Sequence, residues 1–281
     1  MNSSRVVMKL GGSSLTDPSV LSIITQALKL YRKYDYQVIL VHGGGPAINA
    51  ELSRCGIEWS FVNGQRVTTP EMMGVIESVL CGDINRKLVR QLVSHGIQSV
   101  GFSGADCNTL LCKRASKMLG QVGAIKEVNT KWLEGLLALP GNPLPVIAPI
   151  GIGEQGEAYN INADWAASHL AVALKAEYLI YLTDQKGILD QQKELITQLS
   201  ETTLKKLMRN QAVHGGMAIK TRTMMHALQN GVKAARVMDA RDAETGLWSN
   251  YVGTWCLPKG QDIYQYVPGL RPREESVHVA S

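Results

Sequence analysis

Short apolar runs alternate with longer amphipathic segments along the first half of the chain, and glycines separate many of them. Residues 6–10 and 37–41 are apolar runs typical of buried strands, and a glycine turn follows each one. Residues 18–34 repeat apolar side chains along one helical face, and a second helix follows the glycines at 43–45 and runs to about residue 54. Two consecutive strand–glycine turn–helix units predict parallel strands joined by crossover helices.

The later segments extend the same alternation. A long helical period covers residues 70–94, residues 97–102 and 146–149 favour strands, and loose alternation at 110–128 predicts hairpins. Asn162 is placed to cap a helix that runs to residue 175. The pattern then restarts with a strand at 178–182, a hairpin near 191–192, a short helix capped by Ser200, a longer helix from Gly215 to about 229, and a strand at 234–238.

This order predicts an α/β protein with a mainly parallel central sheet. Because the pattern restarts after residue 175, we expect two lobes, residues 1–175 and 176–258, followed by a polar tail at 259–281. The composition agrees, since 281 residues with 45% hydrophobic side chains are enough to bury the core that such a fold needs.

Charge and cysteine usage exclude several classes of protein. The net charge of +5 is mild and the chain has no dense Lys/Arg run, so we do not expect a nucleic-acid partner. No apolar run approaches the ~20 residues that a membrane span needs, and the first residues are too few and too polar for a signal peptide. Five cysteines without a C-x-x-C pair favour free thiols in a reducing compartment, so we expect a cytoplasmic protein without a metal site.

The two glycine turns match neither common nucleotide signature. The segment at 43–48 is not G-x-G-x-x-G, and no G-x-x-x-x-G-K-[ST] occurs, which disfavours an NAD-dependent dehydrogenase and a Walker loop. Both turns nevertheless stand where a strand ends and a helix begins, where backbone N–H groups and the helix dipole favour an anion. Each turn by itself is equally compatible with a purely structural role.

Two lysines strengthen the case for an anionic ligand. Lys9 lies within an apolar strand, where its charge must be paired or solvated. Lys220 is expected in the first turn of the helix that Gly215 opens, where a cation is unfavourable unless an anion is near. Either lysine could instead point outward to solvent.

Polar residues at two further places have the chemistry to bind an amino-acid-like substrate. Asn162 is a suitable N-cap and Asp164 a suitable first-turn acid, but capping does not explain Asn160, two residues upstream. Arg66 follows an Asn-Gly turn and has the planar guanidinium that recognises a carboxylate in two places at once. Without such a ligand, Arg66 is an ordinary surface arginine.

Taken in order, these segments resemble the amino acid kinase family, and within it the branch that phosphorylates N-acetyl-L-glutamate. The matching segments are K-L-G-G-S at 9–13, H-G-G-G-P at 42–46, N-G-Q-R-V-T at 63–68, A-P-I-G at 148–151, Y-N-I-N-A-D at 159–164, L-T-D at 182–184 with G-I-L at 187–189, G-G-M at 215–217 with Lys220, and V-G-T at 252–254. Their order and spacing hold over nearly the whole chain.

The resemblance implies a three-layer αβα sandwich with two lobes, the first binding the amino-acid substrate and the second ATP. It implies transfer of a phosphoryl group from ATP, with Mg²⁺, to the side-chain carboxylate of N-acetyl-L-glutamate in arginine biosynthesis. Catalysis is then expected from Lys9, Lys220 and Asp164, whose carboxylate would accept from both lysines, and substrate binding from Gly44, Gly45, Arg66 and Asn160. The expected nucleotide-binding residues are Gly11, Gly12, Thr183, Asp184, Gly187 and Met217.

The resemblance also bears on assembly and on the alternatives. We expect a homodimer without arginine inhibition, since only about four residues precede the first strand, and a PII-type regulator is a further partner that the family allows. A sibling kinase of aspartate, glutamate, aminoadipate, carbamate or UMP is the nearest alternative. A regulatory pseudokinase on the same fold is another, although the joint presence of Lys9, Asp164 and Lys220 argues against it; turnover assays separate them.

Overall fold

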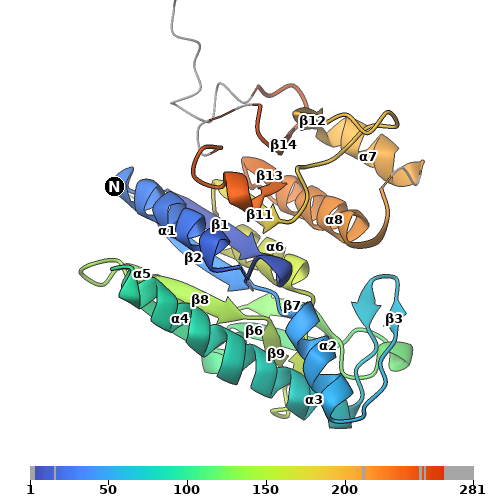
Figure 1. Ribbon diagram of the computed structural model, residues 1–281. Coiled ribbons are helices and arrows are strands. Elements are labelled where there is room, and N and C mark those ends of the chain that lie inside the picture. The colour runs from blue at the N-terminus through green and yellow to red at the C-terminus, as the bar shows by residue number, and fades with distance from the viewer. Residues whose placement is uncertain (1–3, 16, 211–212, 247–248, 250, 263–281) are drawn as a thin grey trace, which may run out of the picture.

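A sheet of eight strands forms the middle layer of the molecule (Figure 1). The structure is a computed structural model that describes residues 4–15, 17–210, 213–246, 249 and 251–262, so the predicted tail lies outside the described residues from 263 onward. In spatial order the strands are β12 (Gln198–Ser200), β14 (Thr254–Leu257), β13 (Ala234–Asp239), β11 (Tyr178–Thr183), β1 (Arg5–Leu10), β2 (Gln37–His42), β8 (Leu144–Ala148) and β5 (Ser99–Ser103). Every neighbouring pair is parallel except β13 and β14, which confirms the predicted mainly parallel sheet.

Helices cover both faces of this sheet, so the three-layer arrangement is confirmed. One face packs against α1 (Pro18–Lys33) and α4 (Asn85–Ser94). The other face packs against α5 (Lys131–Leu137), α6 (Ala163–Ala173), α7 (Glu201–Arg209) and α8 (Gly215–Gln229). Because side chains alternate along a strand, Val6, Met8 and Leu10 of β1 face α1 while Val7 faces α6. Lys9 shares the side of Val7, which directs its ammonium group towards α6.

Smaller elements lie beyond the carboxyl ends of the strands. A four-stranded sheet contains β10 (Ala158–Asn160), β9 (Ile150–Ile152), β6 (Leu110–Arg114) and β7 (Gly123–Val128), and β6 with β7 confirms the predicted hairpin. A separate hairpin pairs β3 (Phe61–Val62) with β4 (Gln65–Arg66). Short 3₁₀ turns occur at Ser13–Leu15, Asp106–Asn108, Lys117–Leu119 and Ala240–Asp242.

The segment predicted as one long helix changes its backbone hydrogen-bonding pattern partway along. It consists of α3 (Pro70–Glu77), a π-helical segment (Ser78–Ile84) and α4. Together with α2 (Gly45–Arg54), α3 and the π-helical segment bury a separate apolar cluster against Ala148 and Ile150. The π turn was not predicted, because its buried residues Leu80 and Ile84 are four positions apart, which is also the spacing of an α-helix.

The central sheet is continuous across the predicted lobe boundary. Residue 176 falls between α6 and β11, and β11 pairs directly with β1 of the first half. The division into lobes therefore stays a prediction. The register places the ends of β1, β2 and β11 at one level, since Leu10 lies opposite both His42 and Leu182. Among the described residues, no helix is long and apolar enough to cross a membrane.

Candidate active site

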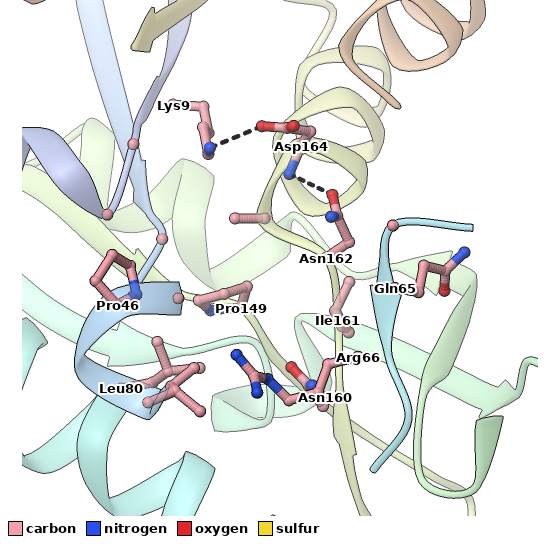
Figure 2. Close-up of a pocket in the computed structure, with 18 of the residues that line it drawn as sticks. Lys9, Pro46, Gln65, Arg66, Leu80, Pro149, Asn160, Ile161, Asn162 and Asp164 are labelled. Atoms are coloured by element: carbon pink, nitrogen blue, oxygen red, sulfur yellow. Dashed lines mark hydrogen bonds and ion pairs between the residues drawn. The ribbon is translucent and has the colours of Figure 1, made fainter. Parts of the chain in front are cut away.

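A cavity of about 430 Å³ opens at the level where β1, β2 and β11 end (Figure 2). It brings together most of the residues predicted from the sequence, although they come from distant segments. These residues are Lys9, Gly11, Gly12, Gly44, Gly45, Arg66, Asn160, Asp164, Thr183, Asp184 and Lys220. The predicted residues Gly187 and Met217 line a neighbouring cavity instead.

A buried carboxylate joins the two lysines at one side of this cavity. Asp164, in the first turn of α6, is 4% exposed, and its Oδ1 lies 2.8 Å from Nζ of Lys9, which is 7% exposed (Figure 2). Its Oδ2 accepts a hydrogen bond of 3.3 Å from Nζ of Lys220 on α8. One carboxylate thus holds two ammonium groups that come from opposite ends of the chain, and the three groups together carry one net positive charge.

The ionisation of this cluster follows from its burial and its internal contacts. Burial by itself would raise the pKa of Asp164, but the charges of Lys9 and Lys220 outweigh it and the pKa lies below its ordinary value. Burial is also the main reason why the pKa of Lys220 is lowered, and the neighbouring Lys9 adds to this. Asp164 is therefore a carboxylate at neutral pH, and it opposes the loss of the proton from Lys220.

The position of Lys220 corrects one detail of the sequence analysis. Because α8 begins at Gly215, Lys220 is its sixth residue and lies in the second turn, so the predicted first-turn position is wrong. Its ammonium group is paired with Asp164 on α6 and not with an anion at the start of its own helix. The pairing of Lys220 with Asp164, 56 positions away, was expected from the family resemblance and not from the local pattern.

The two glycine turns meet at the floor of the cavity. A side chain at Gly12 would place its Cβ 3.0 Å from the backbone nitrogen of Gly44 and 3.1 Å from that of Gly45, so any larger residue would crowd both amides. Gly44 is the N-cap of α2 and Gly45 its first residue, and the first N–H groups of a helix have no partner within it. The N–H of Gly11 instead donates to the carbonyl of Leu182 (2.8 Å), which leaves Gly12, Gly44 and Gly45 as the candidate donors.

A buried histidine supports the second glycine turn. The Nδ1 of His42 lies 2.9 Å from the carbonyl oxygen of Gly43, and its Nε2 lies 3.1 Å from Nδ2 of Asn85. Burial lowers the pKa of His42 to about 4, so the ring is neutral at pH 7. A neutral ring that donates from Nδ1 and accepts at Nε2 satisfies both contacts. Asn85, just after the π-helical segment, was not predicted as part of this arrangement.

Arg66 lies at the opposite end of the cavity, on β4. It is 6% exposed, which is incompatible with a surface role, and its guanidinium carbon lies 4.7 Å from the centre of the Phe61 ring. Nη2 donates to Oδ1 of Asn49 on α2 (2.5 Å), while Nη1 is buried and has no partner among the described residues. The contacts of Asn49 and Phe61 were not predicted, since neither residue belongs to a motif that marks such a contact.

Asn160 lies beside Arg66, and like Arg66 it uses one side-chain atom for a hydrogen bond within the protein and leaves another available to a ligand. Its Nδ2 donates to Oγ1 of Thr68 (3.0 Å), and the Thr68 hydroxyl donates to the carbonyl of Arg66 (3.0 Å). The side-chain oxygen of Asn160 is left to accept a hydrogen bond. Asn162 caps α6 as predicted, because its Oδ1 accepts from the N–H groups of Asp164 (2.9 Å) and Trp165 (3.3 Å).

A second cavity of about 470 Å³ adjoins the first on the side of β11 and α8. Thr183, Asp184 and Lys220 line both cavities, so Lys220 stands at their junction. Further residues that line the second cavity are Gln185, Gly187, Leu189, Asp190, Val213, His214, Gly216 and Met217. Of these, Gly187 and Met217 were predicted.

The described residues contain no group of three or more His, Cys, Asp or Glu side chains that could hold a metal ion. Asp164 is already paired with two lysines, so it is a poor ligand for a cation. Mg²⁺ is commonly bound through one or two carboxylates and the phosphates of a substrate. Asp184 is the carboxylate that lines both cavities and fits that mode of binding.

Comparison with known proteins places this geometry in a family. The model of the amino acid kinase family matches residues 4–239. The acetylglutamate kinase of Aquifex aeolicus is 40% identical over 252 residues, which cover 84% of each chain. The acetylglutamate kinase of Ruegeria pomeroyi is 39% identical over 236 residues (84% of this chain, 82% of the relative), and that of Neisseria meningitidis is 35% identical over 269 residues (92% and 90%).

Solved structures share the fold at lower identity. N-acetylglutamate synthase from Neisseria gonorrhoeae, complexed with coenzyme A and N-acetyl-glutamate, superposes with a TM-score of 0.79 at 20% identity and covers 90% of this chain and 59% of that one. Carbamate kinase from Giardia lamblia bound to AMP-PNP gives a TM-score of 0.67 at 17% identity, with 92% and 99% of the two chains covered. From the family model and the relatives, the chain belongs to the amino acid kinase family.

Proposed function

We propose that this protein transfers the γ-phosphoryl group of ATP to the side-chain carboxylate of N-acetyl-L-glutamate, which gives an acyl phosphate. The observation that carries the proposal is the buried carboxylate of Asp164 holding Lys9 at 2.8 Å and Lys220 at 3.3 Å at the junction of two cavities. The similarity to acetylglutamate kinases over 84% of the chain supports the choice of substrate.

The residues of the first cavity suit a reaction that needs no general base. A glutamate-type carboxyl group has a pKa of about 4.3, so the nucleophile is already ionised at neutral pH. The main difficulty is to bring this anion up to the anionic phosphoryl group and to stabilise the charge that moves in the transition state. Fixed cations and backbone N–H groups do both, and the cavity contains both.

The two lysines are the proposed catalytic groups. Lys9 comes from the first half of the chain and Lys220 from the second, so they can contact a phosphoryl group from two sides. Asp164 fixes both ammonium groups before the substrates arrive, which removes the cost of orienting them during the reaction. Gly12, Gly44 and Gly45 would donate backbone N–H groups to the phosphoryl and carboxylate oxygens.

The acylamino acid is proposed to lie between the glycine turns and Arg66. The unpartnered Nη1 of Arg66 would bind its α-carboxylate, because a buried charged N–H group without an acceptor is costly until an anion pairs with it. The free side-chain oxygen of Asn160 would accept the N–H of the acylamino group. Three cations (Lys9, Arg66, Lys220) and two carboxylates (Asp164, Asp184) line the cavity, a net charge of +1 that favours an anionic substrate.

ATP is proposed to occupy the second cavity, with Thr183, Asp184, Gly187 and Met217 around it and its γ-phosphate directed to Lys220. Mg²⁺ would enter with the nucleotide phosphates, near Asp184, and would supply positive charge to them. The residues of this chain do the rest, because they hold the two substrates in line for transfer.

The decisive assay is ATP turnover with N-acetyl-L-glutamate, in which hydroxylamine traps the acyl phosphate as a hydroxamate. L-Glutamate, L-aspartate and N-acetyl-aminoadipate are tested alongside. Turnover with N-acetyl-L-glutamate is expected. Turnover with another acid alone would keep the chemistry and replace the substrate, and no turnover with any acid would favour a regulatory protein on this fold.

The catalytic assignment has its own test in two substitutions. Lys9→Ala and Lys220→Ala are each expected to lower kcat about 10²–10³-fold, the loss typical of one transition-state donor. Lys233→Ala is a matched control, because Lys233 also pairs with a carboxylate, Glu177, but is exposed and lines neither cavity. Near-normal turnover of both cavity variants would show that the lysines do not act in this way.

We further propose a cytoplasmic homodimer that acts in arginine biosynthesis. The family resemblance supports all three features, and sedimentation of the purified protein measures the oligomeric state. A PII-type regulator is a proposed partner on the resemblance alone. Co-sedimentation with a purified PII protein tests that contact.

A further inference from the structure

Helices α6 and α8 meet a second time, away from the substrate cavity. The first meeting is the pair Asp164–Lys220. Ser168 lies four residues after Asp164, hence one turn further along the same face of α6, and there it contacts Thr223 and His226 of α8. Ser168 is fully buried, and it lines neither cavity described above.

The two hydrogen bonds of Ser168 have a defined donor and acceptor. The Ser168 hydroxyl lies 2.8 Å from the backbone carbonyl of Thr223 and 2.8 Å from Nδ1 of His226. A hydroxyl has a single proton, and a carbonyl can only accept, so the proton of Ser168 goes to Thr223. Nδ1 of His226 must therefore be the donor, which fixes the imidazole in the tautomer that is protonated at Nδ1.

Neighbouring rings hold His226 in this orientation. The ring of His169, on α6, lies 4.5 Å from that of His226 between centroids, and Trp165 contacts both at 5.9 Å and 5.6 Å. Burial and the neighbouring His226 lower the pKa of His169 to about 4, and burial lowers the pKa of His226. Both rings are thus neutral at pH 7 and can pack together without mutual repulsion.

The same turn of α8 is also tied to the sheet and to the catalytic lysine. Tyr181 of β11, which is fully buried, donates to Oγ1 of Thr223 (2.7 Å). The Thr223 hydroxyl in turn donates to the backbone carbonyl of Lys220 (2.9 Å). The turn that follows Lys220 is therefore fixed to both α6 and β11, whereas the Lys220 side chain is tied to α6 by its ion pair with Asp164 at 3.3 Å.

We propose that Ser168 and His226 form a clasp between α6 and α8 that sets the position of Lys220 relative to Asp164, which makes both positioning residues for phosphoryl transfer. This inference rests on the proposed function. Neither residue touches the substrates, and each acts through the helix that carries a catalytic group. Small displacements matter at this point, because a shift of about 1 Å in a reacting geometry can cost about 100-fold in rate.

The test compares the loss of the clasp with the loss of the ring packing alone. His226→Ala and Ser168→Ala each remove the clasp and are expected to lower kcat about tenfold, with both KM values within about twofold of the wild type. His226→Asn is expected to restore most of kcat, because its side-chain N–H group can occupy the place of Nδ1. His169→Ala removes the ring contact but keeps the clasp, so it is expected to lower the melting temperature while kcat stays within about twofold.

Two further measurements separate positioning from a purely structural role. The double variant Ser168→Ala/His226→Ala should lose no more kcat than either single variant, since both break one contact. His95→Ala, at the exposed end of α4, is the control for removal of a histidine and should leave kcat unchanged. Ser168→Ala changes only one buried oxygen, so it remains informative if His226→Ala does not fold.

The outcomes distinguish this inference from the proposed function. If the wild type phosphorylates none of the tested acids, the proposed function fails and the inference fails with it. If the wild type is active but folded Ser168→Ala keeps its full kcat, the inference alone is overturned. It is also overturned if kcat falls equally in His169→Ala and His226→Ala, because the loss would then follow packing and not the clasp.

Discussion

Replacement of Asp164 by asparagine is the substitution that examines the site most directly. The side chain keeps its shape but loses the charge that holds Lys9 at 2.8 Å and Lys220 at 3.3 Å. The net charge of the three groups then rises from +1 to +2 in a place where Lys9 is 7% exposed. The amide oxygen of the new side chain would still accept one hydrogen bond, so any large effect must come from the missing charge.

The size of the effect follows from the burial of the cluster. Removal of one partner from a buried ion pair typically costs about 3–5 kcal/mol, because the remaining charge is left uncompensated. For a chain of this size that corresponds to a loss of roughly 6–20 °C in melting temperature. Since both ammonium groups lose their anchor, kcat should fall at least as far as it does on removal of a single lysine, about 10²–10³-fold.

The stability difference should depend on pH in a defined direction. The pKa of Asp164 is lowered in the folded protein, so its charge adds stability that is fully present above the unfolded pKa of about 4. That contribution is lost as the pH falls below about 4 towards the folded pKa. The gap between the wild type and Asp164→Asn should therefore be constant at neutral pH and shrink only in acid.

Denaturant unfolding from pH 7 to pH 3 and the hydroxamate assay at pH 7 make these measurements. Asp239→Asn is the matched control, because Asp239 is 3% exposed and pairs with Arg241 but lines neither cavity. It should lose stability without a comparable loss of kcat. Wild-type stability and turnover in folded Asp164→Asn would refute the claim that this carboxylate organises the lysines.

Three further outcomes are expected. Arg66→Lys should raise the KM for the acylamino acid about 10–100-fold with little change in kcat, because a charged hydrogen bond worth about 1.5–3 kcal/mol is lost. An unchanged KM would show that Arg66 does not bind the substrate. Gly64→Ala should destabilise the β3–β4 turn, since φ of Gly64 is 76° and the new Cβ would lie 2.7 Å from Cδ1 of Ile219. Adding Ile219→Val, which removes that methyl group, should restore part of the lost stability. A double variant no more stable than Gly64→Ala would contradict the contact. Burial raises the pKa of the Cys112 thiol to about 12, so iodoacetamide at pH 7.5 should leave Cys112 unmodified in the folded protein. Rapid labelling of Cys112, detected by mass spectrometry, would contradict its burial.

The sequence predicted the architecture well, because the fold depends on repeated local patterns. Apolar strands followed by glycine turns imply parallel strands whose ends meet at one edge, and Leu10 does lie level with His42 and Leu182. The same logic made Lys9 informative, since a lysine in an apolar strand needs a partner. The partner, Asp164, was predicted from the family resemblance and not from the strand itself.

The contacts that local patterns do not encode were missed. Nothing in the sequence indicates that Asn49 accepts from Arg66, because this contact depends on how α2 packs beside the β3–β4 hairpin. Arg236 could have been found, since it interrupts an apolar strand as Lys9 does. It is fully buried, donates to the carbonyl of Gly246 (2.6 Å), and lies 4.4 Å from the centre of the Trp255 ring.

The contact between the glycine turns bears on how this cavity could change in evolution or in the laboratory. At the phosphoryl end the wall is backbone against backbone, with Gly12 so close to the amides of Gly44 and Gly45 that a single added carbon would push them apart. At the other end, beside Arg66, the wall consists of side chains such as Phe61, which can be exchanged one at a time. New acyl specificity is therefore most accessible at that end, while the chemistry at the glycine end is inherited almost unaltered.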